Sequence, residues 1–131
     1  MITRINPDTL HTNPAFAQVA TVSSRARLVF VGGQNSTDTS GQIVGHDIAS
    51  QSAQAFRNVL AALEAAGATM NDVVGLAIYI VQGQSIQDAY QAAMNIPGAY
   101  GGPPTGTVLV VAGLGRPEAL IEIEALAAVA E

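Results

Sequence analysis

Residues 73–81, which read Val-Val-Gly-Leu-Ala-Ile-Tyr-Ile-Val, constrain the fold more than any other part of this chain. The segment is rich in β-branched residues and is mostly apolar on both of its faces. This pattern is typical of a central strand that is buried on both sides of its sheet. A sheet built around such a strand needs a cover on each face.

A first amphipathic helix is predicted between Asp47 and Gly67. Asp47 has a side chain suited to the N-cap, and Gly67 suits the position just after the last turn. Apolar residues recur between them at spacings of four and three, which places them on one side of a helix. This apolar stripe consists of Ala49, Ala53, Phe56, Leu60 and Leu63.

A second, shorter helix is predicted from Ser85, its N-cap, to about Met94. Its buried stripe would consist of Ile86, Ala89, Tyr90 and Ala93. The run from Pro97 to Pro104 then breaks the helix and forms a loop. Two helices of this size are enough to cover one face of a four- to six-stranded sheet, but not both.

Further strands are predicted at both ends of the chain. Residues 105–111 and 121–129 have strand patterns, and in the latter Glu122 and Glu124 share the face opposite to Ile121 and Ile123. Residues 18–22 and 27–31 favour a β-hairpin, with the second strand ended by Gly32 and Gly33. A small extra strand is expected at residues 2–5. The order of elements predicts one α+β domain that spans residues 1–131, with a mixed sheet and two helices on one face.

The composition suggests what covers the second face. Hydrophobic residues make up 49% of the chain and charged residues only 11%, against about 25% in a typical soluble domain. A monomer with so few charges would expose a large apolar surface, so we expect another copy of the same sheet to cover it. No segment has the long apolar run of a membrane span, and residues 1–6 do not have the pattern of a signal peptide, so no membrane partner is expected.

The same counts argue against several classes of function. Five basic residues and a net charge of −5 are too few positive charges for a nucleic-acid groove. The absence of cysteine excludes disulfides and thiolate chemistry, and fits a cytoplasmic protein. His11 and His46 lie in predicted loops without the spacing of metal ligands, so no metal site is predicted.

Two features remain as candidates for function. Gly32 and Gly33 follow a strand without opening a helix, so they indicate either a turn that needs positive φ or a close approach of the backbone to a ligand. Glu122 and Glu124 point the same way from an otherwise apolar strand. They are either solvent-facing or, if that face is buried between subunits, carboxylates that need partners and are candidate acids or bases.

Three runs of sequence resemble the RidA/YjgF superfamily of reactive intermediate deaminases, the "endoribonuclease L-PSP" type. They are Phe-Val-Gly-Gly-Gln at 30–34, Leu-Glu-Ala-Ala-Gly-Ala at 63–68, and Gly-Arg-Pro-Glu-Ala-Leu-Ile-Glu-Ile-Glu-Ala-Leu-Ala at 115–127. The resemblance extends from about Ile5 to Ala130. It implies a chorismate-mutase-like fold and a homotrimer in which three sheets form a central barrel, with small-molecule sites in the clefts between subunits.

The resemblance also implies roles for particular residues. Family members hydrolyse imines or enamines without a cofactor, and the glutamate that activates water falls at Glu122. Gly33 keeps the glycine at the strand end, Phe16 replaces a tyrosine, and Tyr90 falls near an asparagine of the second helix. The arginine that binds the substrate carboxylate falls at Gly106, beside Thr107. This chain would therefore be a branch without that arginine, and Gly106 would leave a space the size of its side chain.

Three functions follow as alternatives. The first is a hydrolase for an imine, enamine or related reactive metabolite, with Glu122 as catalytic base, an atypical specificity, and Phe16, Gly33, Tyr90, Gly106 and Thr107 as substrate-binding residues. The second is a trimer that binds a metabolite without turnover. The third, ribonuclease activity, is disfavoured by the acidic charge.

Overall fold

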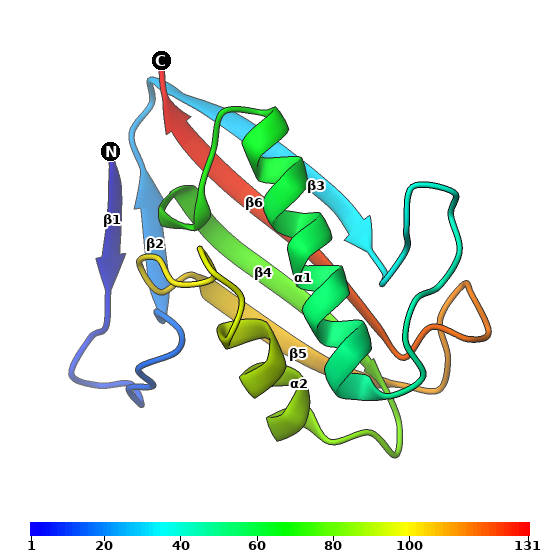
Figure 1. Cartoon of the computed structure of the whole chain (residues 1–131). Coiled ribbons are helices and arrows are strands. Elements are labelled where there is room, and N and C mark those ends of the chain that lie inside the picture. Colours follow the sequence, from blue (N-terminus) through cyan, green and yellow to red (C-terminus); the bar gives the residue numbers. More distant parts are fainter.

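The computed structural model describes residues 1–131 as a two-layer α+β fold (Figure 1). Its strands are β1 (Ile2–Ile5), β2 (Val19–Val22), β3 (Ala26–Gln34), β4 (Val73–Val81), β5 (Thr105–Val111) and β6 (Ile121–Ala130). Its helices are α1 (Ile48–Ala65) and α2 (Ile86–Met94), and a short 3-10 helix η1 (Met70–Asp72) precedes β4. Both α-helices lie on the same face of the main sheet, as the sequence predicts.

The main sheet has four strands in the order β3-β6-β4-β5. β6 is antiparallel to both of its neighbours, whereas β4 and β5 are parallel and are connected through α2. The predicted bounds of β4 and β5 are confirmed, and β6 runs one residue further than predicted. β4 lies inside the sheet, between β6 and β5, as its apolar sequence requires.

The predicted hairpin between residues 18–22 and 27–31 is wrong. β2 instead pairs with β1 over four residues, from Ile2 opposite Val22 to Ile5 opposite Val19. β3 pairs along β6 from Ala26, and it continues through Gly32 and Gly33 to Gln34, with an irregularity in the register after Val31. The polar turn at residues 23–25 therefore carries the chain from the two-stranded sheet to the four-stranded sheet.

The ends of α1 are as predicted, but its most buried line is not. The Asp47 side chain accepts a hydrogen bond from the Ser50 N–H at 2.7 Å, and Gly67 takes the left-handed conformation with φ +75°. Of the predicted stripe, only Phe56 and Leu63 are buried. Near the N-terminal end of the helix, the buried residues include Gln51 and Ser52 instead. Polar side chains are tolerated there because both are hydrogen-bonded.

Gln51 and Ser52 join α1 to three other parts of the chain. The Gln51 amide donates to the carbonyl oxygens of Gly45 and Glu118 and accepts from the N–H of Leu120. The Ser52 hydroxyl donates to the carbonyl oxygen of Ala89 in α2 at 2.7 Å. These contacts satisfy the buried polar groups, so the helix can bury them at little cost.

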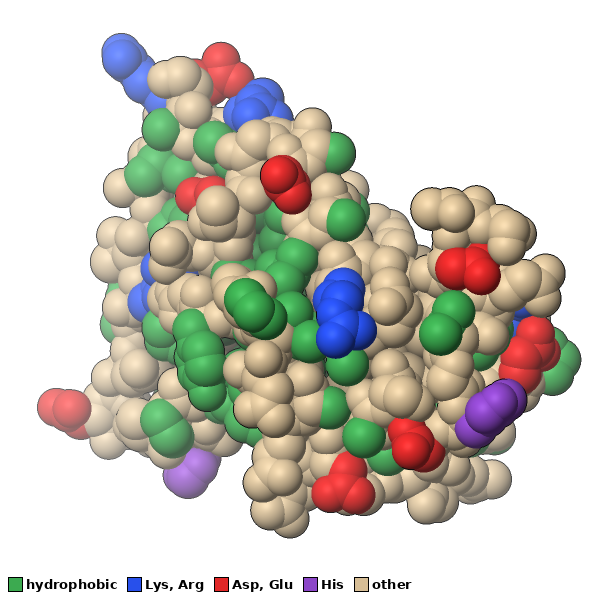
Figure 2. All heavy atoms as spheres, viewed as in Figure 1, with side chains coloured by type: hydrophobic (Ala, Val, Ile, Leu, Met, Phe, Trp, Pro, Cys, Tyr) green, Lys and Arg blue, Asp and Glu red, His purple; other side chains and the backbone are tan.

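α2 packs against α1 and makes almost no close approach to the sheet. Ala89 and Ala93 are buried as predicted, but Ile86 and Tyr90 are 46% and 43% exposed. Their predicted burial is wrong because α2 stands away from the strands that they would contact. From the helix side, hydrophobic side chains gather in the left part of the molecule, over the region of the loop that follows α2 (Figure 2).

No helix covers the other face of the sheet (Figure 1). It exposes Leu28, Phe30 and Leu109, of which Phe30 is 78% exposed. The register places Glu122 on this face, opposite Tyr79. Neither α1 nor α2 combines the length and the apolarity that a membrane crossing needs.

Candidate functional site

Glu122 lies half-buried on the face of the sheet that carries no helix. Its Oε1 atom accepts a hydrogen bond from Asn35 Nδ2 at 3.2 Å, and the same Asn35 group donates to the backbone carbonyl of Ile121 at 2.9 Å. The Oε2 atom accepts no hydrogen bond within the chain, and no basic side chain forms an ion pair with this carboxylate. Glu122 is therefore held by one oxygen, while the other is available to a water molecule or a ligand.

Gly33 leaves the room that this carboxylate occupies. A Cβ atom at residue 33 would overlap Glu122 Oε2 and would lie 2.8 Å from Cδ. Gly32 has nothing within 4 Å of the same position. Neither glycine has positive φ, so the predicted turn with that geometry is wrong. The close approach of the backbone at Gly33 is real, and within the chain the group that approaches it is Glu122.

Glu124, two residues further along β6, is in a different environment. Its Oε1 atom accepts a hydrogen bond from the Tyr79 hydroxyl at 2.6 Å. This hydrogen bond, together with desolvation and the negative charges of Glu124 and Glu122, raises the pKa of Tyr79 above its ordinary value of 10.0. Because the Tyr79 hydroxyl already donates a hydrogen bond to the Glu124 carboxylate, Glu122 is the carboxylate better placed to act on a ligand.

Thr107 lies on this same face. It is opposite Ala77 in β4, which in turn is opposite Glu124 in β6. Since residues opposite each other in a sheet share a face, Thr107 belongs with Glu122 and Gly33. Sequence reasoning did not find Asn35 or Tyr79, the two side chains that hold the carboxylates, because their partners come from strands far away in the chain.

The three other predicted site residues lie on the opposite, helix-covered face. Gly106 is opposite Leu76, whose side chain lines a cavity below α2 together with Phe16 and Tyr90. An added Cβ at Gly106 would overlap the ring of Phe16, whose Cζ would be only 3.0 Å away. The predicted empty space at Gly106 is therefore absent, because the Phe16 ring occupies it. The six predicted residues thus belong to two faces of the sheet, although Thr107 borders a small cavity with Phe16 and Gly106 at the edge strand β5.

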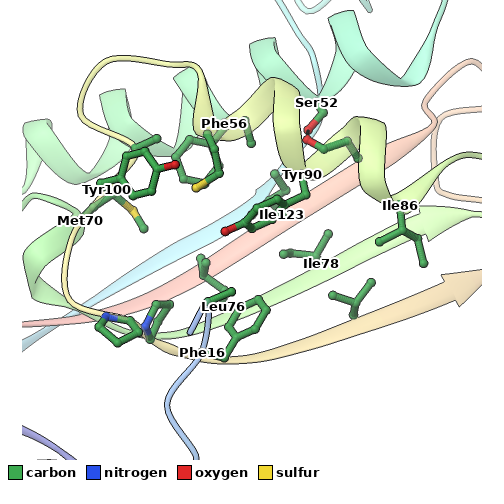
Figure 3. A pocket seen from close by; sticks show the side chains of 18 of the residues that line it. Phe16, Ser52, Phe56, Met70, Leu76, Ile78, Ile86, Tyr90, Tyr100 and Ile123 are labelled. Atoms are coloured by element: carbon green, nitrogen blue, oxygen red, sulfur yellow. Dashed lines mark hydrogen bonds between the residues drawn. The ribbon is translucent and has the colours of Figure 1, made fainter. Parts of the chain in front are cut away.

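The cavity below α2 has a volume of about 620 Å³ (Figure 3). Tyr90 reaches into it from α2, Leu76 and Ile78 from β4, and Phe16 from the N-terminal segment. A smaller cavity of about 420 Å³ also borders Phe16 and includes His11, Gly106 and Thr107. Sequence reasoning missed the larger cavity, although part of its signal is present: the two buried residues of α2, Ala89 and Ala93, are both small.

The site contains no arrangement that suggests a metal. Nowhere in the chain do three or more histidine, aspartate or glutamate side chains gather as metal ligands would. His11 lies in the N-terminal segment and His46 just before α1, at residues that the fold does not bring together with Glu122. The available chemistry is that of one accessible carboxylate and its neutral polar neighbours.

The element order, the mixed sheet and the two helices on one face define an α+β protein with the chorismate-mutase-like architecture of RidA/YjgF proteins. Comparison with solved structures supports this class. A Rid family protein of unknown function from Yersinia pestis, YyfB, is 30% identical, with a TM-score of 0.85 and 98% of both chains covered. RidA from an Antarctic Psychrobacter species is 26% identical, with a TM-score of 0.67 and coverage of 94% of this chain and 100% of that one.

Sequence comparison then gives the family. The model of the family described as endoribonuclease L-PSP matches residues 9–129. A RutC family protein of Pyrococcus horikoshii is 37% identical over 103 residues, which are 76% of this chain and 77% of that protein. The chain belongs to the RidA/YjgF/L-PSP family, as its sequence motifs indicated.

Proposed function

We propose that this protein is a homotrimeric hydrolase for a reactive imine or enamine, with Glu122 as the general base. The observation that carries the proposal is the state of the Glu122 carboxylate. Asn35 holds Oε1 at 3.2 Å, while Oε2 is free of partners on an uncovered face. A fixed carboxylate with one unused oxygen is the arrangement that activates a water molecule.

The reaction on an imine needs only water and a proton carrier. Glu122 accepts a proton from water as the water oxygen attacks the imine carbon, and it returns that proton to the nitrogen. The resulting carbinolamine loses ammonia as the carbon–oxygen double bond forms, again with proton transfer through the carboxylate. The balance is one imine and one water consumed, and one carbonyl compound and one ammonia formed; an enamine first takes up a proton at carbon to become the imine. No cofactor takes part.

Association of three copies supplies the missing cover. The helix-free face carries Glu122 among exposed apolar side chains, including Phe30 at 78% exposure. Burying these side chains against the sheets of other copies removes apolar surface from water. It also encloses Glu122 in a cleft between subunits, where a reactive intermediate is protected from bulk solvent.

The proposed specificity follows from the side chains around this cleft. Gly33 and Thr107 share the face of Glu122, so they line the cleft in the same subunit. Phe16, Tyr90 and Gly106 lie on the other face, so they contribute to the same cleft only from a neighbouring subunit. At Gly106, the position aligned with the family's arginine, the Phe16 ring replaces a charged anchor. The proposed substrate is therefore an imine without a small-acid carboxylate as its main anchor.

A coupled assay tests this function. A flavin-dependent amine oxidase generates imines with varied side chains and no carboxylate, an amino acid oxidase generates 2-imino acids for comparison, and the clearance of both is followed with wild type, Glu122→Gln and Glu118→Gln. Glu118 is an exposed glutamate paired with Arg116 at 3.2 Å, which makes it a matched control. We expect Glu122→Gln to lower the rate at least 100-fold with the trimer intact, within the range of general-base catalysis of roughly 10²–10⁴, and the control to behave as wild type. Equal rates in all three proteins would contradict the role of Glu122.

The alternative is a trimer that binds a metabolite without turnover. It is favoured by the lack of a charged anchor at Gly106, where the Phe16 ring lies instead. Its signature is saturable ligand binding with no clearance of any imine. Ribonuclease activity is less compatible with the surface, because Arg4, Arg27 and Arg116 all donate to backbone carbonyl oxygens within the chain. They leave few free cations for phosphate groups.

A further inference from the structure

Asn35 holds Glu122 from a loop rather than from the sheet. It is the first residue after β3, and its Nδ2 atom donates to Glu122 Oε1 at 3.2 Å and to the carbonyl oxygen of Ile121 at 2.9 Å. A loop lacks the ladder of hydrogen bonds that fixes a strand, so its side chains hold a partner only as firmly as the loop itself is held. The position of the Glu122 carboxylate therefore depends on what fixes the backbone at residues 35–37.

Asn58 of α1 fixes that backbone. Its Nδ2 atom donates to the carbonyl oxygens of Asn35 at 3.0 Å and Thr37 at 2.9 Å. An amide nitrogen carries two hydrogens, so one Asn58 side chain can hold both carbonyl groups at once. Between them, Ser36 is fully buried and is joined to Val44 by two hydrogen bonds of 2.8 Å. The loop after β3, which lies beside α1 in Figure 1, is thus tied to the helix.

Gln54 sets the orientation of the Asn58 amide. It lies one helical turn before Asn58, and its Nε2 atom donates to Asn58 Oδ1 at 3.0 Å. The Asn58 oxygen is directed toward Gln54, so its nitrogen is directed toward the loop. Three hydrogen bonds then lead from α1 to the carboxylate: from Gln54 to Asn58, from Asn58 to the Asn35 backbone, and from the Asn35 side chain to Glu122.

This chain of hydrogen bonds connects the two faces of the sheet. Gln54 and Asn58 belong to the helix layer, whereas Glu122 lies on the face without helices. Because β3 is an edge strand, the loop that follows it can contact both layers. The three hydrogen bonds are all partly buried, where solvent competes less for their polar groups.

We propose that Asn35 and Asn58 are positioning residues for Glu122. Asn58 fixes the loop after β3, and Asn35 holds Oε1 of the carboxylate, so that Oε2 is presented to the reacting water. A glutamate side chain has several rotatable bonds, and without Asn35 its carboxylate would occupy several positions, of which few suit proton transfer. This inference rests on the proposed hydrolysis for the reaction that it names, and it adds a part for α1 in that chemistry.

Steady-state kinetics of imine clearance test the proposal. The variants are Asn35→Ala and Asn58→Ala, and the matched control is Gln91→Ala, which removes an exposed amide side chain from α2. We expect kcat to fall about 10-fold in Asn35→Ala and about five-fold in Asn58→Ala, less than the roughly 100-fold that a misplacement of about 1 Å can cost. KM should stay within about two-fold of wild type, because the loss is confined to the transition state. The control should behave as wild type.

A double variant separates positioning from a merely structural effect. If Asn35 acts through Glu122, Asn35→Ala should cause no further loss of rate in the Glu122→Gln protein. A structural defect would instead lower the rate by the same factor in both backgrounds. Asn35→Gln retains an amide donor on a longer side chain, and it should recover part of the kcat that Asn35→Ala loses.

Nuclear magnetic resonance of the full-length protein gives a readout that needs no turnover. The side-chain amide signal of Asn35, identified by its loss in Asn35→Ala, should shift in Glu122→Gln and in Asn58→Ala and stay in place in Gln91→Ala. If Asn58→Ala does not fold, Gln54→Ala releases the Asn58 amide and should shift the same signal by a smaller amount. These shifts in a protein that clears no imine would support the positioning and contradict the hydrolase.

Two results would overturn the proposal. The first is an Asn35 amide signal that does not respond to the change at Asn58 or Gln54. The second is a wild-type kcat in folded Asn35→Ala when Glu122→Gln has lost its activity. In that second case the hydrolase stands and only the positioning role fails.

Discussion

The ring of Phe16 lies against the Cα atom of Gly106, so closely that a Cβ atom added at residue 106 would overlap its Cε1 and Cδ1 atoms. The two residues are 90 positions apart in the chain, and they meet because the N-terminal segment crosses the edge strand β5 on the side of α2. At this point the family resemblance places an arginine. An arginine at residue 106 would require the phenylalanine ring to leave.

This contact predicts the effect of adding one methyl group. Gly106→Ala should destabilise the protein by about 1 kcal/mol, the lower end of the range for overpacking, because Phe16 is only half-buried. The backbone at Gly106 does not have positive φ, so the effect would be steric alone. Urea unfolding measures the change.

Two further variants test whether contact with Phe16 causes the destabilisation. Gly113→Ala, where nothing lies within 4 Å of the new atom, is the control and should be close to wild type. The double variant Phe16→Ala with Gly106→Ala should show less destabilisation than the sum of the single changes. Additive effects would mean that the two residues do not interact.

The regular elements were predictable because their signals are local. Asp47 and Ser85 accept the hydrogen bonds expected of N-caps, and the apolar run at 73–81 became β4 with the predicted bounds. The pairing of β2 was not predictable in this way. A short strand such as residues 18–22 has no feature that distinguishes β1 from β3 as its partner, and the choice depends on which strand takes the free edge of β6.

The candidate site also combines features with a local sequence signal and contacts that have none. Alternation in β6 correctly placed Glu122 and Glu124 together on one face. The partners Asn35 and Tyr79, and the ring over Gly106, come from segments distant in sequence, and no local pattern reports such contacts. Gln51 and Ser52 show the same limit in the core, because hydrogen bonds to distant carbonyl oxygens let polar residues occupy buried helix positions.

Gly33 and Gly32 provide a matched pair that tests the Glu122 site. A Cβ atom at residue 33 meets the end of a flexible glutamate side chain, so Gly33→Ala should fold but displace the carboxylate from its present position. Gly32→Ala meets nothing within 4 Å. We expect imine clearance to fall at least 10-fold in Gly33→Ala and to stay at the wild-type rate in Gly32→Ala, with similar thermal unfolding for both. A normal rate in Gly33→Ala would show that the approach of Gly33 to Glu122 is not needed for activity.

Tyr79 should ionise late in an alkaline titration. Its hydrogen bond to Glu124, with desolvation and the nearby carboxylates, raises its pKa above 10.0. Because the folded-state pKa of Tyr79 is the higher one, the contribution of this group to stability is complete below the pKa of the unfolded chain and is lost as pH rises through the folded-state pKa.

The ultraviolet absorbance of phenolate follows the titration of Tyr79. Tyr79→Phe should remove the late component, and Glu124→Gln should move it to lower pH. A late component that survives in Tyr79→Phe belongs to another tyrosine.

The cap at Asp47 predicts a pH dependence of opposite sign. Hydrogen bonds from the Ser50 hydroxyl and then from its N–H hold the pKa of Asp47 below its usual value of 3.8. The charged cap therefore stabilises the fold above the unfolded-state pKa, and its contribution is lost as pH falls through the folded-state pKa.

Asp47→Ala should lower the unfolding temperature at pH 7, and the difference in unfolding temperature from wild type should narrow below pH 3.8. Asp47→Asn retains a cap without a charge, so its own pH profile should lack this component. A gap that is independent of pH would contradict the charged cap.

Phe30 tests whether the helix-free face is buried between subunits. Phe30, Leu28 and Leu109 are 78%, 50% and 44% exposed in the single chain. Burial of a phenylalanine is worth about 1.5–3 kcal/mol, and burying an aspartate in its place is costly. Phe30→Asp should therefore weaken association at least 10-fold in sedimentation experiments. Ala61→Asp, on the exposed side of α1, should sediment as wild type.

If the cleft around Glu122 forms only between copies, imine clearance by Phe30→Asp should fall in parallel with the trimer fraction. A dissociated variant with full activity would show that one chain suffices for the chemistry.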